Sequence, residues 1–124
     1  MIRSLALMFR YLIPFVFLGL PLAAQEVQSA AGGLIRTLDK TSGATKDFEV
    51  SKGGSASISN LQIVLADCRY PRGNPSGNAY AALEVSETGK AGVVFSGWMI
   101  ASAPALSAME HQRYDVWIMR CITS

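Results

Sequence analysis

Cysteine, histidine and charge are all scarce in this sequence, and each scarcity excludes a class of protein. The 124 residues include two cysteines, without a Cys-x-x-Cys pair, and one histidine. These are too few ligands for a zinc site, and a redox-active dithiol is excluded, so no metal or other cofactor is expected. Charged residues make up 16% of the chain and hydrophobic residues 50%, which excludes a disordered acidic or basic chain. A single globular domain is therefore expected.

The net charge of +2 comes from the first 24 residues. Arg3 and Arg10 lie there, and removing this segment leaves nine basic residues against nine acidic ones. A neutral domain lacks the bulk positive charge on which binding to nucleic acid or anionic lipid depends. We therefore expect no nucleic-acid partner.

The same 24 residues have the pattern of a secretory signal peptide. They combine a basic start, an apolar run over residues 11–22 and the small residues Ala23 and Ala24. No pair of adjacent arginines precedes the run and no cysteine directly follows it, which favours the general secretory route. We therefore expect export to the periplasm with residues 1–24 removed.

A retained membrane anchor is the competing interpretation of this segment. A spanning helix needs about 20 apolar residues, whereas Arg10, Pro14 and Pro21 interrupt this stretch. Cleavage is therefore favoured, and the mature protein is expected to have no membrane span. The small residue Ala24 suits the cleavage site, and a cut after Ala31 is the alternative.

The two cysteines, Cys68 and Cys121, are predicted to form one structural disulfide. In an oxidising compartment, an isolated pair in a domain of about 100 residues is normally bonded. A bond across this loop of 53 residues stabilises a fold by about 4 kcal/mol in the chain-entropy model. That is a large share of the roughly 5–15 kcal/mol that holds a small domain together.

Short strands separated by turn residues follow a lead-in, residues 25–32, that is expected to be flexible. Strands are predicted over residues 34–39, 45–51, 58–68, 79–86, 93–101 and 114–121. In all, about seven short strands at spacings near ten residues predict an all-β fold, a small antiparallel β-sandwich or partly closed barrel, over residues 33–124. Pro104 lies near the start of the last long connection, which predicts a short helical cap over residues 103–109.

Alternation along the strands predicts which side chains are buried. The strand over residues 58–68 is expected to be central and covered on both sides. Its two faces carry Leu61, Ile63 and Leu65 on one side and Val64, Ala66 and Cys68 on the other. In the strand over residues 79–86, Ala81, Leu83 and Val85 are expected to point inward.

The last strand and the cap are expected to complete the core. Trp117 shares a face with Cys121, and a disulfide buries that face, so Trp117 is expected to point inward. Both Trp98 and Trp117 are expected in or lining the core. Leu106 and Met109 are expected to close the open end of the fold. The small residues that are expected to lie flat on the sheet are Ala103, Ala105 and Ala108.

One group of residues suggests catalysis. Glu110, His111 and Asp115 are close in sequence and suit acid/base chemistry beside Ser96 or Ser102 as nucleophile. Ser96, however, does not stand in a G-x-S-x-G frame. The alternative interpretation is a structured loop in which the carboxylates bind turn amides and His111 bonds to the backbone, and this one is favoured.

The aromatic residues suggest a second kind of site. Aromatic faces stack on sugar rings while polar neighbours orient the sugar, although most aromatic side chains of small sandwiches belong to the core. The tryptophans are expected in the core, whereas Tyr70 and Tyr80 flank a loop rich in proline and glycine. The candidate binding residues are therefore Tyr70, Tyr80 and His111.

The sequence also resembles a known family. The segments that carry the resemblance are GLIRTLDKTSG (residues 33–43), CRYP (68–71), FSGWM (95–99), PAL (104–106), EH (110–111), YDVW (114–117) and Cys121. In this order they are similar to the DUF2155 family of exported bacterial proteins, although Gln112 stands where the family usually has proline. The resemblance implies a signal peptide, a small periplasmic domain and a bond between Cys68 and Cys121, and it implies no activity.

Two functions remain open on this evidence. The favoured one is a non-enzymatic envelope module, expected to be a monomer, that binds an envelope protein or cell-wall component through loops at residues 70–78 and 102–112. The other is a small hydrolase, with glycans as a candidate substrate, that uses Glu110, His111 and Asp115. Open access to these three side chains would favour the hydrolase, and burial into backbone hydrogen bonds would favour the module.

Overall fold

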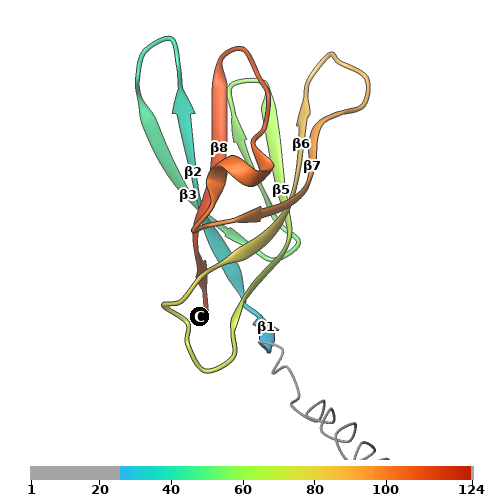
Figure 1. The fold of residues 1–124 in the computed structure, drawn as a ribbon. Coiled ribbons are helices and arrows are strands. Elements are labelled where there is room, and N and C mark those ends of the chain that lie inside the picture. The colour runs from blue at the N-terminus through green and yellow to red at the C-terminus, as the bar shows by residue number, and fades with distance from the viewer. Residues whose placement is uncertain (1–25, 124) are drawn as a thin grey trace, which may run out of the picture.

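The computed structural model describes residues 26–123, which form eight strands in two antiparallel sheets (Figure 1). The predicted signal peptide lies outside these residues. The strands are β1 (Val27–Ser29), β2 (Gly32–Asp39), β3 (Thr45–Ser51), β4 (Ser55–Ile58), β5 (Leu61–Pro71), β6 (Tyr80–Glu87), β7 (Val93–Ile100) and β8 (Tyr114–Ile122). A short 3-10 helix, η2 (Pro104–Ser107), precedes β8.

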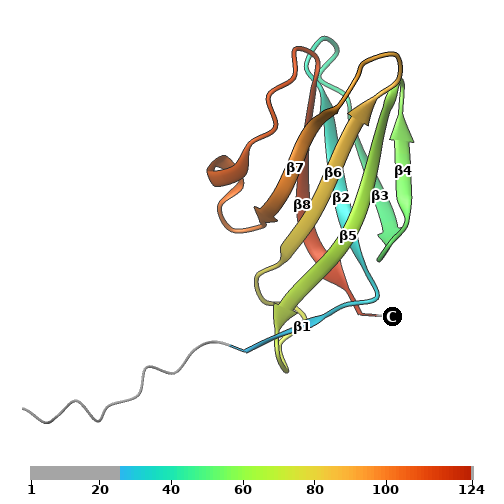
Figure 2. The ribbon, with the colours of Figure 1, turned by 90° about the vertical axis from the view of Figure 1, so that its right-hand side faces the viewer.

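The two sheets pack face to face as a sandwich (Figure 2). Sheet A has the order β1-β5-β6-β7, with β4 also paired to β5, and sheet B has the order β3-β2-β8. The sheets do not close into a barrel in the part of the chain that the structure describes. The predicted all-β class is confirmed, and of the two predicted architectures the sandwich is the one formed.

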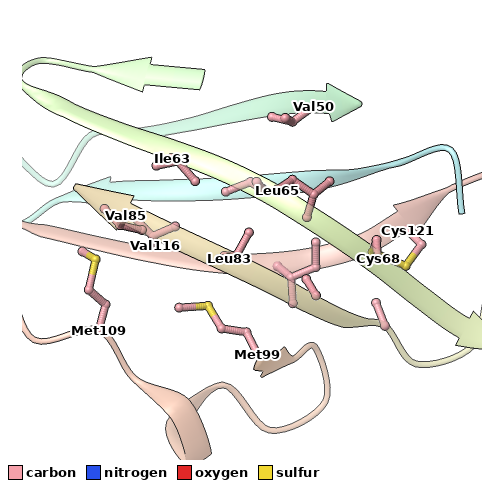
Figure 3. Close-up of a cluster of buried hydrophobic side chains, with 14 of the residues drawn as sticks. Val50, Ile63, Leu65, Cys68, Leu83, Val85, Met99, Met109, Val116 and Cys121 are labelled. Carbon is pink, nitrogen blue, oxygen red and sulfur yellow. A yellow bond between two sulfur atoms is a disulfide. The ribbon is translucent and has the colours of Figure 1, made fainter. Parts of the chain in front are cut away.

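The core lies between the sheets, where alternate residues of the strands meet (Figure 3). The largest fully buried side chains are Ile35, Leu61, Ile63, Leu65, Leu83, Val85, Thr37, Cys68 and Ile118. Removing each aliphatic side chain of this set from water contributes about 1.5–3 kcal/mol. The predicted inward set of β6, Ala81, Leu83 and Val85, is confirmed.

Two of the hairpin turns differ in the residue that has positive φ, which is glycine in one and serine in the other. Gly43 has φ +78° in the β2–β3 turn, a conformation that glycine adopts without a steric penalty. Between β4 and β5 the two-residue turn is Ser59-Asn60, and Ser59 has φ +54°. The strand predicted from residue 58 therefore starts too early, because Ile58 belongs to β4.

The expected flexible lead-in is part of the sandwich. β1 pairs with the end of β5, with Val27 opposite Pro71. Ala30 is buried, and its N–H donates to the carbonyl of Cys68 at 2.7 Å. β2 already begins at Gly32. The expectation of a flexible segment is thus wrong for residues 27–32, because the strand pairing orders them.

A bulge in β5 changes which face its second half presents. Ala66 is an extra residue relative to β6, because Leu65 and Asp67 lie opposite consecutive residues of β6. The alternation shifts by one residue there, so Cys68 joins the buried face of Leu65. Gln62 and Ala66 are exposed, so the prediction of a strand covered on both sides is wrong.

A second bulge has the same effect in β8. Met119 is extra, because Ile118 and Arg120 lie opposite consecutive residues of β2. Cys121 consequently joins the buried face of Ile118, and Trp117 is left on the outer face, half-buried. The prediction that Trp117 shares the buried face of Cys121 is wrong because this bulge separates them, but Trp117 does pack against the core, as expected of a residue that lines it.

The two bulges bring the cysteines together between the sheets. Cys68 and Cys121 form a disulfide with their Cα atoms 5.8 Å apart, which confirms the predicted pair (Figure 3). The bond joins β5 of sheet A to β8 of sheet B. It is a covalent connection through the core between sheets that share no hydrogen-bonded strand pair in the described residues.

The predicted helical cap exists as η2, but it covers less of the core than expected. Met109 is buried beneath it, as predicted. Leu106 is 73% exposed, so the prediction that it closes the open end of the fold is wrong. Ala105 and Ala108 are also exposed, so they do not lie flat on the sheet as predicted. The 3-10 helix η2 itself contributes no buried residue. In the described residues, no helix has the length and apolar character needed to cross a membrane.

Candidate functional site

His111 is held by the backbone on one side and by a carboxylate on the other. Its Nδ1 accepts hydrogen bonds from the N–H groups of Arg113 and Tyr114 at 3.0 and 3.1 Å. A nitrogen that accepts two hydrogen bonds carries no proton, so the ring proton of the neutral imidazole is on Nε2. Nε2 then donates to Oε1 of Glu87 at 3.1 Å.

This arrangement leaves His111 without a ring nitrogen for proton transfer. In an acid/base triad, one imidazole nitrogen binds an orienting carboxylate and the other faces the nucleophile. Here the second nitrogen faces backbone N–H donors instead. The geometry matches the favoured interpretation, in which His111 bonds to the backbone.

The other residues of the hydrolase hypothesis do not converge on His111. Glu110 is exposed, and Asp115 forms an ion pair with Lys40 at 3.4 Å. Ser96 is exposed on β7, and Oγ of Ser102 accepts a hydrogen bond from Asn78 at 2.8 Å. No described serine bonds to His111.

A pocket of about 580 Å³ adjoins the histidine. It is lined by Lys40, Glu87, Lys90, Val94, Met109, Glu110, His111 and Gln112. The hydrogen bond from His111 is the main cause that lowers the pKa of Glu87; burial opposes it, whereas the hydrogen bond from Asn60 and the charge of Lys90 also lower it. The pocket carries two lysines and two glutamates, so its charge does not select a cation or an anion.

Ion pairs join the same end of the sandwich to the β2–β3 turn. Asp39 accepts hydrogen bonds from the Arg113 guanidinium, the shortest at 2.9 Å, and from Thr41. The Arg113 bonds are the main reason why the pKa of Asp39 lies far below its usual value. Lys40 Nζ donates to the carbonyl of His111 at 2.8 Å. The cluster therefore ties the chain before β8 to β2 and β6, which is a structural role.

The two candidate tyrosines lie in different places. Tyr70 is 7% exposed at the end of β5, and its hydroxyl accepts a hydrogen bond from Gln28 at 2.7 Å. A ligand on the surface has little access to it. Tyr80 is half-buried at the start of β6, on the outer face of sheet A.

Tyr80 belongs to an aromatic surface that we call the Trp98 surface. Its residues are Val27, Arg69, Tyr80, Trp98 and Ile100, which line a shallow depression of about 380 Å³ on the outer face of sheet A. Trp98 is 44% exposed, so the expectation that it lies in or lines the core is wrong. The reason is the alternation of β7, where the next residue, Met99, is the one that points into the core.

Arg69 lies against the Trp98 indole and is held there by Asp67. Its Cζ lies 5.2 Å from the centroid of the Trp98 ring, within cation–π range. Its Nε donates to Oδ2 of Asp67 at 2.8 Å. Burial alone raises the pKa of Asp67, but the hydrogen bonds from Arg69 and Ser29, with the charges of Lys52 and Arg69, lower it below its usual value. Asp67 is therefore a stable anionic support for the guanidinium.

The sequence pointed to Tyr80 but not to the residues around it. A visible signal existed for Arg69, because Asp67 and Arg69 are two apart on one strand and so share a face. No local sequence pattern pairs Val27 with Trp98, because these residues come to one surface only through the order of the strands in sheet A. In the described residues, no group of three or more histidine, cysteine or acidic side chains could hold a metal ion.

The comparison with protein families matches residues 33–121 to the family described as an uncharacterized protein conserved in bacteria, DUF2155. The match runs from β2 to the disulfide cysteine of β8. The chain belongs to the DUF2155 family. The search of curated proteins found no similar protein, and the search of solved structures found no similar structure.

The DUF2155 match includes His111 and most of the Trp98 surface. The FSGWM segment of the resemblance is the half of β7 that carries Trp98, and the EH segment supplies His111. The matched range also contains Arg69 and Tyr80, whereas Val27 lies before it. The family description names no substrate, so the chemistry of the site is argued from its residues.

Proposed function

We propose that this DUF2155 protein is exported to the periplasm and works there as a non-enzymatic binding module. The signal-peptide pattern of residues 1–24 supports export. The Cys68–Cys121 disulfide also supports it, because such bonds persist in oxidising compartments and are rare in the cytosol. A hydrolase is not favoured, because both ring nitrogens of His111 are engaged in hydrogen bonds.

The observation that carries the binding function is the exposure of Trp98 beside Tyr80 and Arg69. Tryptophan, tyrosine and arginine are the residue types that most often dominate binding energy at interfaces. The strands of sheet A hold them, so little freedom is lost when a ligand binds. The binding surface proposed from the fold is therefore a sheet face, in place of the loops at residues 70–78 and 102–112.

The position of β1 bears on where the signal peptide is removed. A cut after Ala24 leaves the whole of β1 in the mature protein. A cut after Ala31 removes β1 and the buried residue Ala30. The first site is therefore the one that we propose, which gives a mature protein that starts at Gln25.

Mass spectrometry of the protein isolated from the periplasmic fraction tests export and processing together. We expect the intact mass of a chain that starts at Gln25. This mass should be lower than that of the reduced chain by two hydrogen atoms. A chain that retains Met1 in the membrane fraction would contradict the proposal.

Cross-linking in cells tests the binding surface. A photoreactive amino acid at position 96 is expected to cross-link to an envelope component, because Ser96 is exposed on the same face of β7 as Trp98 and its replacement leaves the indole in place. A photoreactive amino acid at position 106 serves as the control. Leu106 suits this control because it is exposed and apolar and lies outside the Trp98 surface. Equal labelling from both positions, or none from position 96, would refute the assigned surface.

A further inference from the structure

The Trp98 surface has the features of a sugar-binding platform. The first of these features is the orientation of the Trp98 indole. Arg69 is on β5 and Trp98 on β7, so β6 runs between them. Neighbouring strands are about 4.8 Å apart, yet the guanidinium carbon is only 5.2 Å from the ring centroid. The two side chains must therefore reach towards each other over β6.

The residue beneath this contact is small. Ala82 lies opposite Trp98 in the pairing of β6 with β7, and opposite Asp67 in the pairing of β5 with β6. A methyl group at this position leaves space for the indole to lean across the sheet. The Arg69 guanidinium covers part of the indole, and the 44% of Trp98 that remains exposed is the aromatic area open to a ligand.

An aromatic platform of this kind suits a pyranose ring. One face of the sugar carries C–H groups, which are attracted to the negative face of an aromatic ring. The hydroxyl groups at the rim of the sugar need polar partners. The Tyr80 phenol and the Arg69 guanidinium supply them, because Nε of Arg69 is bonded to Asp67 and the Nη groups form no hydrogen bond to a described residue.

The aliphatic neighbours narrow the class of sugar. Val27 and Ile100 complete the surface and provide contacts for a methyl group. An acetamido group has a methyl for this apolar side and a carbonyl oxygen for the arginine donors. A sugar with hydroxyl groups alone leaves Val27 and Ile100 without a matching group.

The size of the surface favours a glycan over a folded protein partner. A stable protein interface covers about 800 Å² on each side. Only two of the large hydrophobic residues that are exposed in residues 26–123 belong to this surface, Val27 and Trp98. A surface this small and shallow suits a short stretch of an extended sugar chain.

We propose that the Trp98 surface binds a chain of N-acetylated amino sugars, with the indole stacked on one sugar ring and Arg69 on its acetamido carbonyl. The proposal rests on the binding function and the periplasmic location proposed above. It deepens that function by naming the ligand class.

Tryptophan fluorescence gives a direct test, because Trp98 and Trp117 are the only tryptophans of the chain. In the Trp117→Phe variant, the emission reports Trp98 alone. We expect the tetramer of N-acetylglucosamine to shift this emission to shorter wavelength in a saturable way. Maltotetraose, which has no acetamido groups, is expected to bind at least about tenfold more weakly.

Co-sedimentation with purified peptidoglycan sacculi tests the same surface in the otherwise unchanged mature protein. Trp98→Ala is expected to weaken binding at least about tenfold, the usual result of truncating a dominant contact residue. Leu106→Ala is the matched control, and we expect it to bind like the wild type. Arg69→Lys keeps the charge but loses the planar donor fork, and should also weaken binding. Equal thermal midpoints would show that the variants are folded.

The outcomes separate this inference from the proposed function. Absence of binding to both the tetramer and the sacculi would overturn the sugar proposal. If position 96 still cross-links to a protein in cells, the binding module stands and only the ligand class is wrong. If neither glycan nor protein is found at position 96, both proposals fail. Equal losses in Trp98→Ala and Leu106→Ala would also overturn the sugar proposal.

Discussion

At the scale of single residues, Ala66 and Met119 decide where the cysteines point. Each is the extra residue of a bulge, and without it Cys68 and Cys121 would fall on the outer faces of their strands. The sequence predicted the disulfide from the number of cysteines and the compartment. It did not predict the bulges, because the choice of which residue stays unpaired depends on the partner strand.

The disulfide is expected to supply a large part of the stability. Replacing both cysteines by serine should lower the free energy of unfolding by about 4 kcal/mol, since the bond closes a loop of 53 residues. Urea unfolding, followed by fluorescence, measures this difference. The wild type in reducing buffer serves as a control and should resemble the double variant. Equal midpoints in oxidised and reduced wild type would contradict the expectation.

The Asp39 carboxylate should make the fold sensitive to acid. Its pKa in the folded state lies well below the value of 3.8 for an unperturbed aspartate, chiefly because of the Arg113 hydrogen bonds. The unfolded chain therefore takes up the proton first, and the stabilisation that is complete above about pH 5 is lost progressively as the pH falls below about 4. Thermal midpoints between pH 6 and pH 2 should fall more steeply for the wild type than for Asp39→Asn. Parallel curves for the two proteins would show that this ion pair does not contribute.

His111 is expected to act on stability, since it accepts two backbone hydrogen bonds. His111→Ala leaves the N–H groups of Arg113 and Tyr114 without this acceptor, which should cost about 1 kcal/mol. Hydrogen exchange of these two amides should accelerate in the variant. Unchanged exchange and stability would instead point to a role for the ring in chemistry.

At the scale of elements, strand length decided what the sequence could reveal. The predicted strands are those with several alternating apolar residues between clear turn residues, as in β2, β3 and β6. β1 and β4 have three and four residues, and the turn before β5 is Ser59-Asn60, without glycine or proline. Such short pieces are stabilised by pairing with β5, which no local pattern records.

β1 should contribute measurably to stability although it is short. A chain that starts at Gly32 loses its pairing with β5, the bond from Ala30 to Cys68 and the bond from Gln28 to Tyr70. The two named bonds count for about 1 kcal/mol each and the strand pairing adds to them, so we expect a loss of at least about 2 kcal/mol against a chain that starts at Gln25. Denaturant unfolding of the two proteins measures it. Equal stability would remove the argument against signal-peptide cleavage after Ala31.

At the scale of the whole molecule, the two tryptophans show why the core was only partly predictable. Alternation identified the inward residues of β6 correctly, and it failed for Trp117 beyond a bulge. For Trp98, the usual place of aromatic side chains in small sandwiches suggested burial, but β7 turns Met99 inward instead. The consequence is an exposed aromatic surface on a disulfide-linked sandwich, which is where we place the binding function of this DUF2155 protein.

Sedimentation with isolated cell envelopes tests that placement most directly. The wild type, Trp98→Ala and Leu106→Ala proteins are compared at equal concentration, after their thermal midpoints confirm that all three are folded. We predict that the wild type and Leu106→Ala proteins sediment with the envelopes and that Trp98→Ala stays in the supernatant. Equal sedimentation of all three proteins would contradict the account, because an exposed tryptophan that is dispensable for binding cannot mark the functional surface.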